Sequence, residues 1–389
     1  MLTQQDALLA AVLADENRLG AAVARWISTL RGAEPDAASA QLFPFIYHRL
    51  SQTGIAPALA STLKPYYLRS WSLNTRLFAE LPGVISALAS VAPRPILLKA
   101  AGLIPLLEYD LGARMTGDID VLVPDVAFGA AVAALGRAGW SAHPDEGTVL
   151  DARFTHAIQM FRGANSVDLH CHVLEESCER EADRDFWARA VPVTMNGAEA
   201  RTLAPNDQMI SLCVHGARNV LAAPHLRWLV DAAVIIQRFP IDWRQVTDAG
   251  VARHVAHPLA DALETLRERT GAAVPDDAIA RLRSAPPDEL SRTLHELAGT
   301  AKLGLLSTRL QHHRARFLRG AGPVTGRAFL NAAADYLRFW CQEPRLVRVP
   351  VNVAGRVVRM AAFRLGWYRY ARANPGKRAE SRGSSAASQ

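Results

Sequence analysis

The sequence contains few cysteines for its 389 residues, and their positions exclude two common uses of this residue. The four cysteines form no Cys-x-x-Cys pair and are not densely spaced; they are Cys171, Cys178, Cys213 and Cys341. Disulfide frameworks and zinc knuckles require such pairs or such density. We therefore expect four reduced thiols, as in a cytoplasmic protein.

Long apolar runs are also missing. A membrane-spanning helix needs about 18 or more consecutive, mostly apolar residues, and no uncharged stretch of that kind occurs. At the N-terminus no basic segment precedes an apolar run, and Asp6, Asp15 and Glu16 interrupt the pattern. A signal peptide is therefore not expected. We predict a cytoplasmic protein without a transmembrane segment.

Several common motifs of nucleotide and metal chemistry are absent. There is no P-loop, and the glycines at 320, 322 and 326 have the wrong spacing for a phosphate-binding loop and follow no predicted strand. His295-Glu296 lacks the second histidine of a metalloprotease helix. Catalytic chemistry must therefore be sought among the acidic side chains.

Outside the C-terminal segment the sequence has no net positive charge. Residues 345–389 contain ten Lys and Arg and one Glu, out of 44 basic and 37 acidic residues in the whole chain. Residues 1–344 have 34 basic and 36 acidic side chains, so the formal net charge of +7 comes from the C-terminal segment and does not describe the rest of the chain. Residues 345–372 interleave arginines with apolar residues, which suits an anionic partner such as a phosphate backbone or a membrane surface. A terminal helix packed on the body with solvated arginines fits equally well.

The chain divides into four regions. Half of the residues are hydrophobic, and the length exceeds that of a usual single domain. We predict an N-terminal helical region (1–92), a core with strands (93–195), a C-terminal helical domain (196–372) and a disordered basic tail (373–389).

The core has alternating strand and helix signals. Short apolar runs predict strands at 95–99, 119–123, 153–161 and 166–173, with helices at 103–111 and 127–135. Gly163-Ala164-Asn165 is predicted to form the turn of a hairpin. The fold class expected is α+β: a small mixed sheet with helices on one face, flanked by helical regions.

Three acidic residues stand out in this core. Asp118 and Asp120 are two positions apart at the start of a strand, so both side chains project to one face. Asp168 lies between Val167 and Leu169 in another strand. Carboxylates in such apolar surroundings need a compensating charge, and Mg²⁺ prefers oxygen ligands. The three residues therefore predict a divalent metal site.

Three strings in the core resemble a known family: LKAAG at 98–102, RMTGDIDVLV at 114–123 and VDLH at 167–170. They are similar to the bacterial nucleotidyltransferases of the uncharacterised NTP_transf_5 type, within the polymerase-β superfamily. Weaker similarity continues through LAPND at 203–207, LCVHG at 212–216 and LRWLVD at 226–231. The resemblance covers about residues 95–250.

The resemblance implies roles for individual residues. Asp118 and Asp120 would bind two metal ions, with Asp168 as a third ligand or as the base toward the acceptor. It further implies a nucleotide-binding set around these acids: Lys99, Gly102, Arg114, Gly117 and His170. One departure concerns the glycine that follows the lysine in the family, since Ala100 stands there and Gly102 comes two positions later. Alanine at that point narrows the room for backbone N–H groups to approach a triphosphate.

The expected reaction is transfer of a nucleoside monophosphate from an NTP to an acceptor hydroxyl, with release of pyrophosphate. Mg²⁺ or Mn²⁺ is the expected cofactor and the NTP the co-substrate. The acceptor is a small molecule, a protein side chain or an RNA 3′ end. A non-enzymatic alternative is a degenerate nucleotide-binding or scaffolding protein of the same fold.

Other interpretations of the same residues remain open. Asp168, His170 and His172 share one strand face, and His-x-His is a zinc-ligand spacing, which suggests a zinc-dependent hydrolase. Asp168 alone also suits an ion pair with Arg162 or Arg153. Lys99 suits a phosphate or a carboxylate partner, and Arg114 suits the triphosphate or support of the Asp118 loop. Three later residues suggest structural roles: a packed His215, a core Trp228 and a surface ion pair between Arg227 and Asp231.

Overall fold

The computed structural model describes residues 3–30, 35–143, 149–218, 225–297 and 306–350. It contains a seven-stranded mixed sheet and many flanking helices, which confirms the α+β class. The predicted tail at 373–389 and most of the basic segment at 345–372 lie outside the described residues.

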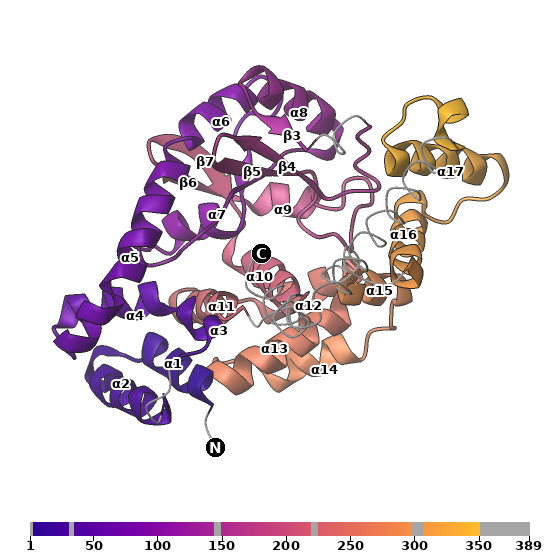
Figure 1. Ribbon diagram of the computed structural model, residues 1–389. Helices are drawn as coiled ribbons and strands as arrows, with labels where there is room; N and C mark the ends of the chain where they lie inside the picture. The colour runs from indigo at the N-terminus through magenta and orange to yellow at the C-terminus, as the bar shows by residue number, and fades with distance from the viewer. Residues whose placement is uncertain (1–2, 31–34, 144–148, 219–224, 298–305, 351–389) are drawn as a thin grey trace, which may run out of the picture.

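Helices precede the sheet. Their bounds are α1 Gln4–Leu13, α2 Glu16–Leu30, α3 Ala37–Ala40, α4 Phe43–Thr53, α5 Pro57–Phe78 and α6 Leu81–Leu88. The long helix α5 runs from the N-terminal helices to the sheet (Figure 1). Proline stands within the first two positions of α4, α5 and α6, where its missing N–H costs no hydrogen bond.

The sheet has the strand order β3-β4-β5-β2-β1-β7-β6. Its strands are β1 Ile96–Leu97, β2 Ile119–Leu122, β3 Ser141–Ala142, β4 Ala157–Arg162, β5 Asn165–His170, β6 Val191–Met195 and β7 Ala198–Thr202. Helices α7 Lys99–Leu106, α8 Phe128–Arg137 and α9 Arg184–Arg189 lie between them in the sequence. Strands β4 and β5 form the predicted hairpin, with Arg162 paired to Asn165 and Gly163 in the left-handed conformation.

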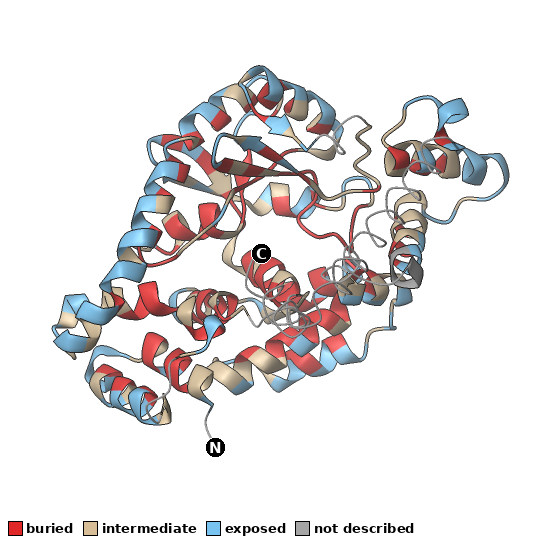
Figure 2. Ribbon diagram, in the orientation of Figure 1, coloured by how far each residue is buried: buried red, intermediate tan, exposed pale blue. Residues whose placement is uncertain are grey.

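The two faces of the sheet have different surroundings. Ile119, Val121, Val167 and Leu169 point into an apolar cluster formed with α6 and α8. The alternate residues of β2 and β5 point to the opposite face, because successive side chains of a strand alternate. In Figure 1 the sheet lies between α6 and α8 above and the helices of the C-terminal half below, and Figure 2 shows its strands as largely buried.

Two expectations about the sheet were wrong. Helices lie on both of its sides, with α6 and α8 on one side and α9 on the other (Figure 1). The sheet also continues beyond residue 195, because β7 pairs in parallel with β1, with Leu97 opposite Thr202. Strand β7 is only five residues long and carries small and charged residues, so its sequence gives a weak strand signal.

A bundle of helices follows the sheet. Its members are α10 Pro205–Arg218, α11 Arg227–Arg238, α12 Trp243–Ala252, α13 Ala256–Thr270, α14 Asp276–Arg283, α15 Glu289–Leu297, α16 Leu306–Ala321 and α17 Gly326–Cys341. The helices α10, α11 and α13 share an apolar core with α1, α2 and α4. The N-terminal and C-terminal helices therefore form one body below the sheet. In the described part of the chain, no helix has both the length and the apolar character that crossing a bilayer requires.

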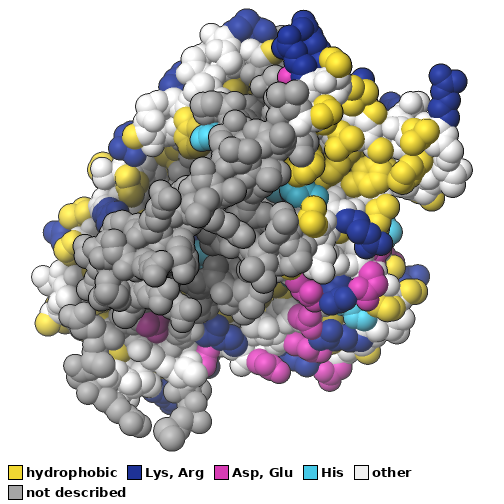
Figure 3. Space-filling view, turned by 45° about the vertical axis from the view of Figure 1, so that its right-hand side comes forward, with side chains coloured by type: hydrophobic (Ala, Val, Ile, Leu, Met, Phe, Trp, Pro, Cys, Tyr) yellow, Lys and Arg dark blue, Asp and Glu magenta, His cyan; other side chains and the backbone are white. Residues whose placement is uncertain are grey.

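Surface charges on the bundle are mixed in sign. Arg281 pairs with Asp248, and Arg283 pairs with Asp261 and Glu264. Figure 3 shows Lys and Arg interspersed with Asp and Glu toward the bottom of the molecule. This mixture agrees with the near-neutral charge of the sequence outside its C-terminus.

Two adjacent buried glutamates connect the segment after β5 to the bundle. Arg218 of α10 donates to Glu176 through Nε at 2.8 Å, and His295 Nδ1 of α15 lies 3.1 Å from the same carboxylate. Glu175 contacts Arg316 and His312 of α16. Burial opposes the charge of Glu176, but Arg218 and His295 outweigh it and lower the pKa of Glu176 to about 2.

This pKa predicts how stability depends on pH. Because the folded pKa is below the ordinary 4.5, Glu176 stabilises the fold above pH 4.5, and this contribution is lost as the pH falls toward 2. Glu176→Gln should lose about 3–5 kcal/mol at pH 7, since it leaves Arg218 buried without its partner. The difference from wild type should shrink between pH 5 and pH 3 in urea unfolding. The exposed Glu296→Gln on α15 should show little change at any pH.

Candidate functional site

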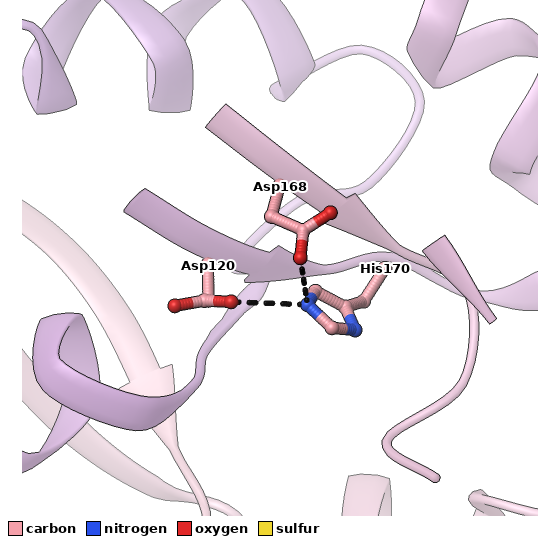
Figure 4. Close-up of side chains that lie close together, drawn as sticks. All are labelled: Asp120, Asp168 and His170. Carbon is pink, nitrogen blue, oxygen red and sulfur yellow. Dashed lines mark hydrogen bonds and ion pairs between the residues drawn. The ribbon is translucent and has the colours of Figure 1, made fainter. Parts of the chain in front are cut away.

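Two acidic residues and a histidine meet on the face of the sheet away from α6 and α8. Strands β2 and β5 pair in parallel with Asp120 directly opposite Asp168. His170, two residues further along β5, lies 3.1 Å from Asp120 Oδ1 and 3.2 Å from Asp168 Oδ2 through Nε2. Figure 4 shows both carboxylates directed at this ring nitrogen. One ligand atom from each of the three residues lies within 4.8 Å of the others.

Lys99 supplies a positive charge to this cluster. Its Nζ lies 2.6 Å from Asp120 Oδ1 and 3.8 Å from Asp168 Oδ2. Lys99 is the first residue of α7 and has a positive φ of 44°, which is unfavourable for a residue with a side chain. Such strain concentrates at functional positions, and here it occurs where the lysine meets the two carboxylates.

The charges in the cluster shift one another's ionisation. Burial opposes the charge of Asp168, but His170 and Lys99 outweigh it and hold the pKa of Asp168 well below its usual range. Burial also opposes the charge of His170, yet Asp168 and Asp120 raise its pKa to about 9. Asp168 is therefore ionised at neutral pH, and His170 acts as a charged donor to it.

Asp118 lies immediately before β2, beside this cluster. The charge of Asp120, followed by burial, raises the pKa of Asp118 to about 7. Its carboxylate is not among the three groups whose ligand atoms converge within 4.8 Å. Asp118 lines a cleft with a volume of about 340 Å³ between the sheet and the helices α10 and α11, and Asp120 of the cluster also lines this cleft.

Arg114 has a supporting role in the structure. Its Nε and Nη2 donate to the carboxylate of Asp231 at 2.7–3.1 Å, and both side chains are buried. The predicted surface ion pair between Arg227 and Asp231 was wrong, because Asp231 faces inward to Arg114. Arg227 instead donates through Nη1 to the backbone oxygen of Met115 at 2.8 Å.

Asn74 of α5 holds the same loop from the other side. Its Nδ2 donates to the backbone oxygens of Leu111 and Arg114 at 2.6 and 2.7 Å. Its Oδ1 accepts from the backbone N–H of Thr116 at 3.2 Å. The segment 111–116, which leads to Asp118, is thus fixed by a fully buried amide and by α11.

The glycines and Ala100 occupy different environments. Gly102 is buried, and a Cβ there would overlap the backbone oxygen of Leu97 and the hydroxyl of Thr202. It is absent from the lining of the cleft, so packing of α7 against β1 and β7 accounts for this glycine. Gly117 is exposed and lines the cleft, and a Cβ there would meet open space. Ala100 is buried and also lines the cleft.

The other side chains that the sequence suggested as neighbours of Asp168 have different partners in the structure. The ring nitrogens of His172 lie 3.2 Å from Asp183 Oδ2 and 3.0 Å from the backbone oxygen of Ala152. His172 is therefore engaged away from Asp168, against the zinc-hydrolase alternative. Arg162 pairs with Glu80, and Arg153 pairs with Asp151 and Asp335. The partners of Asp168 are Lys99 and His170.

The helical wall of the cleft was not predicted. Ser211 and His215 of α10, together with His225, Arg227 and Trp228 beside and within α11, line the cleft opposite the acids. The strings LCVHG and LRWLVD carry several of these residues and indicated the family, but nothing in their spacing placed them against acids about a hundred residues earlier. Asn74 was also missed, since a single asparagine in a helix carries no signal for three contacts with a distant loop.

Comparison with known protein families identifies the family to which the chain belongs. A profile described as "Uncharacterised nucleotidyltransferase" (NTP_transf_5) matches residues 37–271, which is more than half of the chain. The chain belongs to this nucleotidyltransferase family. The matched region includes the whole sheet, α5 with Asn74, and α10 and α11 with the helical wall of the cleft. Searches of curated proteins and of solved structures gave no significant match.

Removing the Asn74 amide should loosen the loop that leads to the acids. Asn74→Ala leaves two buried backbone oxygens and one N–H without their partner, at about 1 kcal/mol or more each. We expect the free energy of unfolding to fall by about 2–4 kcal/mol and Mn²⁺ affinity to weaken. Urea unfolding and Mn²⁺ titration by electron paramagnetic resonance measure the two effects. The exposed Asn331→Ala on α17 is the control, and an unchanged Asn74 variant would contradict the supporting role.

A substitution at Gly102 tests whether this glycine is required for the packing of α7 or for ligand binding. Gly102→Ala should destabilise the fold by about 1–3 kcal/mol, because the new methyl group overlaps the backbone. Gly136→Ala in α8 meets open space and should stabilise slightly, as alanine favours helices. Thermal unfolding of both variants checks this. A Gly102→Ala protein of wild-type stability would make this glycine a candidate nucleotide contact again.

Proposed function

We propose that this protein transfers a nucleoside monophosphate from an NTP to an acceptor hydroxyl. The acceptor oxygen forms a bond to the α-phosphorus, the bond from that phosphorus to the pyrophosphate oxygen breaks, and the hydroxyl proton passes to a base or to water. The observation that carries the proposal is the pairing of Asp120 with Asp168 on neighbouring strands, beside the cleft that also contains Asp118.

The side chains suit a divalent cation. Mg²⁺ and Mn²⁺ prefer carboxylate oxygens, and a nearby imidazole is compatible with Mn²⁺. The effect of Asp120 on the pKa of Asp118 is a sign of crowded like charges, which a cation relieves. Asp118, Asp120 and Asp168 would hold it. When bound, the ion supplies charge neutralisation at the phosphate oxygens and activation of the attacking hydroxyl.

The protein's own groups position these acids. Lys99 and His170 bridge Asp120 and Asp168, so the two carboxylates are held together. Asp168 suits a ligand better than a base, because a carboxylate held so strongly in its charged form accepts a proton poorly. Arg114 orients the loop before Asp118 through Asp231 rather than through a phosphate.

One competing function shares the same fold. A degenerate nucleotide-binding or scaffolding protein would keep the acids without turnover, and Ala100 in the cleft lining favours that alternative. The two functions differ in a measurable way, since only the enzyme forms a new phosphodiester or phosphoester bond and releases pyrophosphate.

Labelling with α-³²P NTPs tests the proposal. The purified protein is incubated with each NTP and Mg²⁺ or Mn²⁺, alone and with cell extract separated into small molecules, proteins and RNA. We expect labelled acceptor and released pyrophosphate with wild type. Asp120→Asn and Asp168→Asn should each lose at least about 100-fold in rate, equivalent to about 2.7 kcal/mol of transition-state stabilisation.

The matched control is Asp185→Asn, which alters a largely exposed carboxylate of α9 and should retain wild-type labelling. Circular dichroism and urea unfolding verify that each variant is folded. Tight NTP binding without label transfer in any fraction would replace the enzyme with the degenerate binder. Equal activity of wild type and the two Asn variants would remove the acids from the reaction.

A further inference from the structure

The cleft beside the acids is lined by three cationic side chains, and two of them are already neutralised. Lys99 is paired with Asp120 at 2.6 Å. Arg114 is paired with Asp231 at 2.7 Å and is buried with it. The positive charges of Lys99 and Arg114 are therefore neutralised by carboxylates of the protein itself.

Arg227, the third cation, has no such partner. Its one hydrogen bond within the described residues runs from Nη1 to the backbone oxygen of Met115, and no carboxylate of that part of the chain lies within 4.0 Å. A guanidinium has five N–H donors, so most of them remain for a ligand. Burial, together with the charge of Arg114, lowers the pKa of Arg227 to about 10. The environment thus disfavours its charge, and a bound anion would compensate for this.

The facing helix α10 offers two neutral polar groups. Ser211 and His215 are four residues apart, so they lie on one helix face, and both line the cleft. Burial and the charges of Lys99 and Arg218 hold the pKa of His215 well below its usual range, so the ring is neutral. Within the described residues no hydrogen bond engages its nitrogens.

Packing fixes the two helices in this arrangement. A Cβ on Gly216 would overlap the ring of Trp228, so the absence of a side chain lets this indole lie directly on α10. Trp228 follows Arg227 in the sequence, and its contact sets how α11 approaches His215. The wall is therefore built by close contact between α10 and α11.

We propose that Arg227, with Ser211 and His215, binds the polyphosphate group of the substrate in the cleft. A planar guanidinium matches phosphate oxygens with two parallel hydrogen bonds, and the neutral hydroxyl and imidazole add donors without further charge. This assignment rests on the proposed function for its substrate. The binding itself can be measured without any turnover.

Isothermal titration with inorganic tripolyphosphate tests the site, with and without Mg²⁺ at fixed ionic strength. Arg227→Gln should weaken binding at least about 10-fold, or about 1.4 kcal/mol. Ser211→Ala and His215→Ala should each weaken it several-fold. Arg244→Gln on α12, where the arginine side chain is 82% exposed, is the matched control and should bind as wild type does.

A second measurement separates ligand binding from support of the loop. Arg227 also holds Met115, so each variant is examined by urea unfolding and by Mn²⁺ titration. The proposal expects lost tripolyphosphate affinity with Mn²⁺ affinity within about twofold of wild type. Equal losses of both affinities in Arg227→Gln, with His215→Ala and Ser211→Ala unchanged, would assign Arg227 to loop support alone and overturn the proposal.

Further outcomes of the titration also test the proposed anion site. Absence of saturable tripolyphosphate binding by wild type overturns the proposal, as does an Arg227→Gln protein that binds within twofold of wild type. Glycerol 3-phosphate that binds as tightly as tripolyphosphate, through Arg227, would assign the site to a phosphate on the acceptor. If tripolyphosphate binds through Arg227 but no NTP is ever turned over, the proposed reaction fails while the anion site stands.

Discussion

Repulsion between carboxylates on neighbouring strands is the constraint around which this structure is organised. Parallel pairing of β2 with β5 places Asp120 opposite Asp168 on one face of the sheet, and Asp118 precedes the same strand. Taking such charges out of water is costly unless opposite charges accompany them. Lys99 and His170 provide those charges at 2.6–3.8 Å, and Lys99 adopts an unfavourable backbone conformation in that position.

Support for this arrangement extends well beyond the sheet. Asn74 and Arg114 join the loop before Asp118 to α5 and to α11, and both contacts are buried. The helical regions at the two ends of the chain share one apolar core. The loop is consequently held by the same body that forms the opposite wall of the cleft, so the distance between acids and wall is set by packing rather than by the sheet alone.

Much of the core was predictable because its signals are local. The apolar run around Ile96 and the alternation through Asp118, Ile119 and Asp120 specify strands and the face on which each acid lies. The similarity of these strings to nucleotidyltransferases proved sound, as the family match across 37–271 shows. Strands β6 and β7 were missed, since both have only five residues, a proline interrupts β6, and β7 carries small and charged residues. Strand β7 pairs with β1, which lies about a hundred residues earlier, and β6 pairs with β7.

The amino-acid sequence alone indicated the family and the pairing of Asp120 with Asp168, because both depend on short strings within the strands; it also predicted Asp118 in the same cluster, whereas the structure groups Asp120 and Asp168 with His170. Which side chains pair with one another depends on the three-dimensional packing. Asp231 belongs to Arg114 and not to its helix neighbour Arg227, and His172 turns to Asp183 rather than to Asp168. These partners lie 11 and 117 residues apart, and they are chosen by burial and by the packing of helices, which spacing along the chain does not encode.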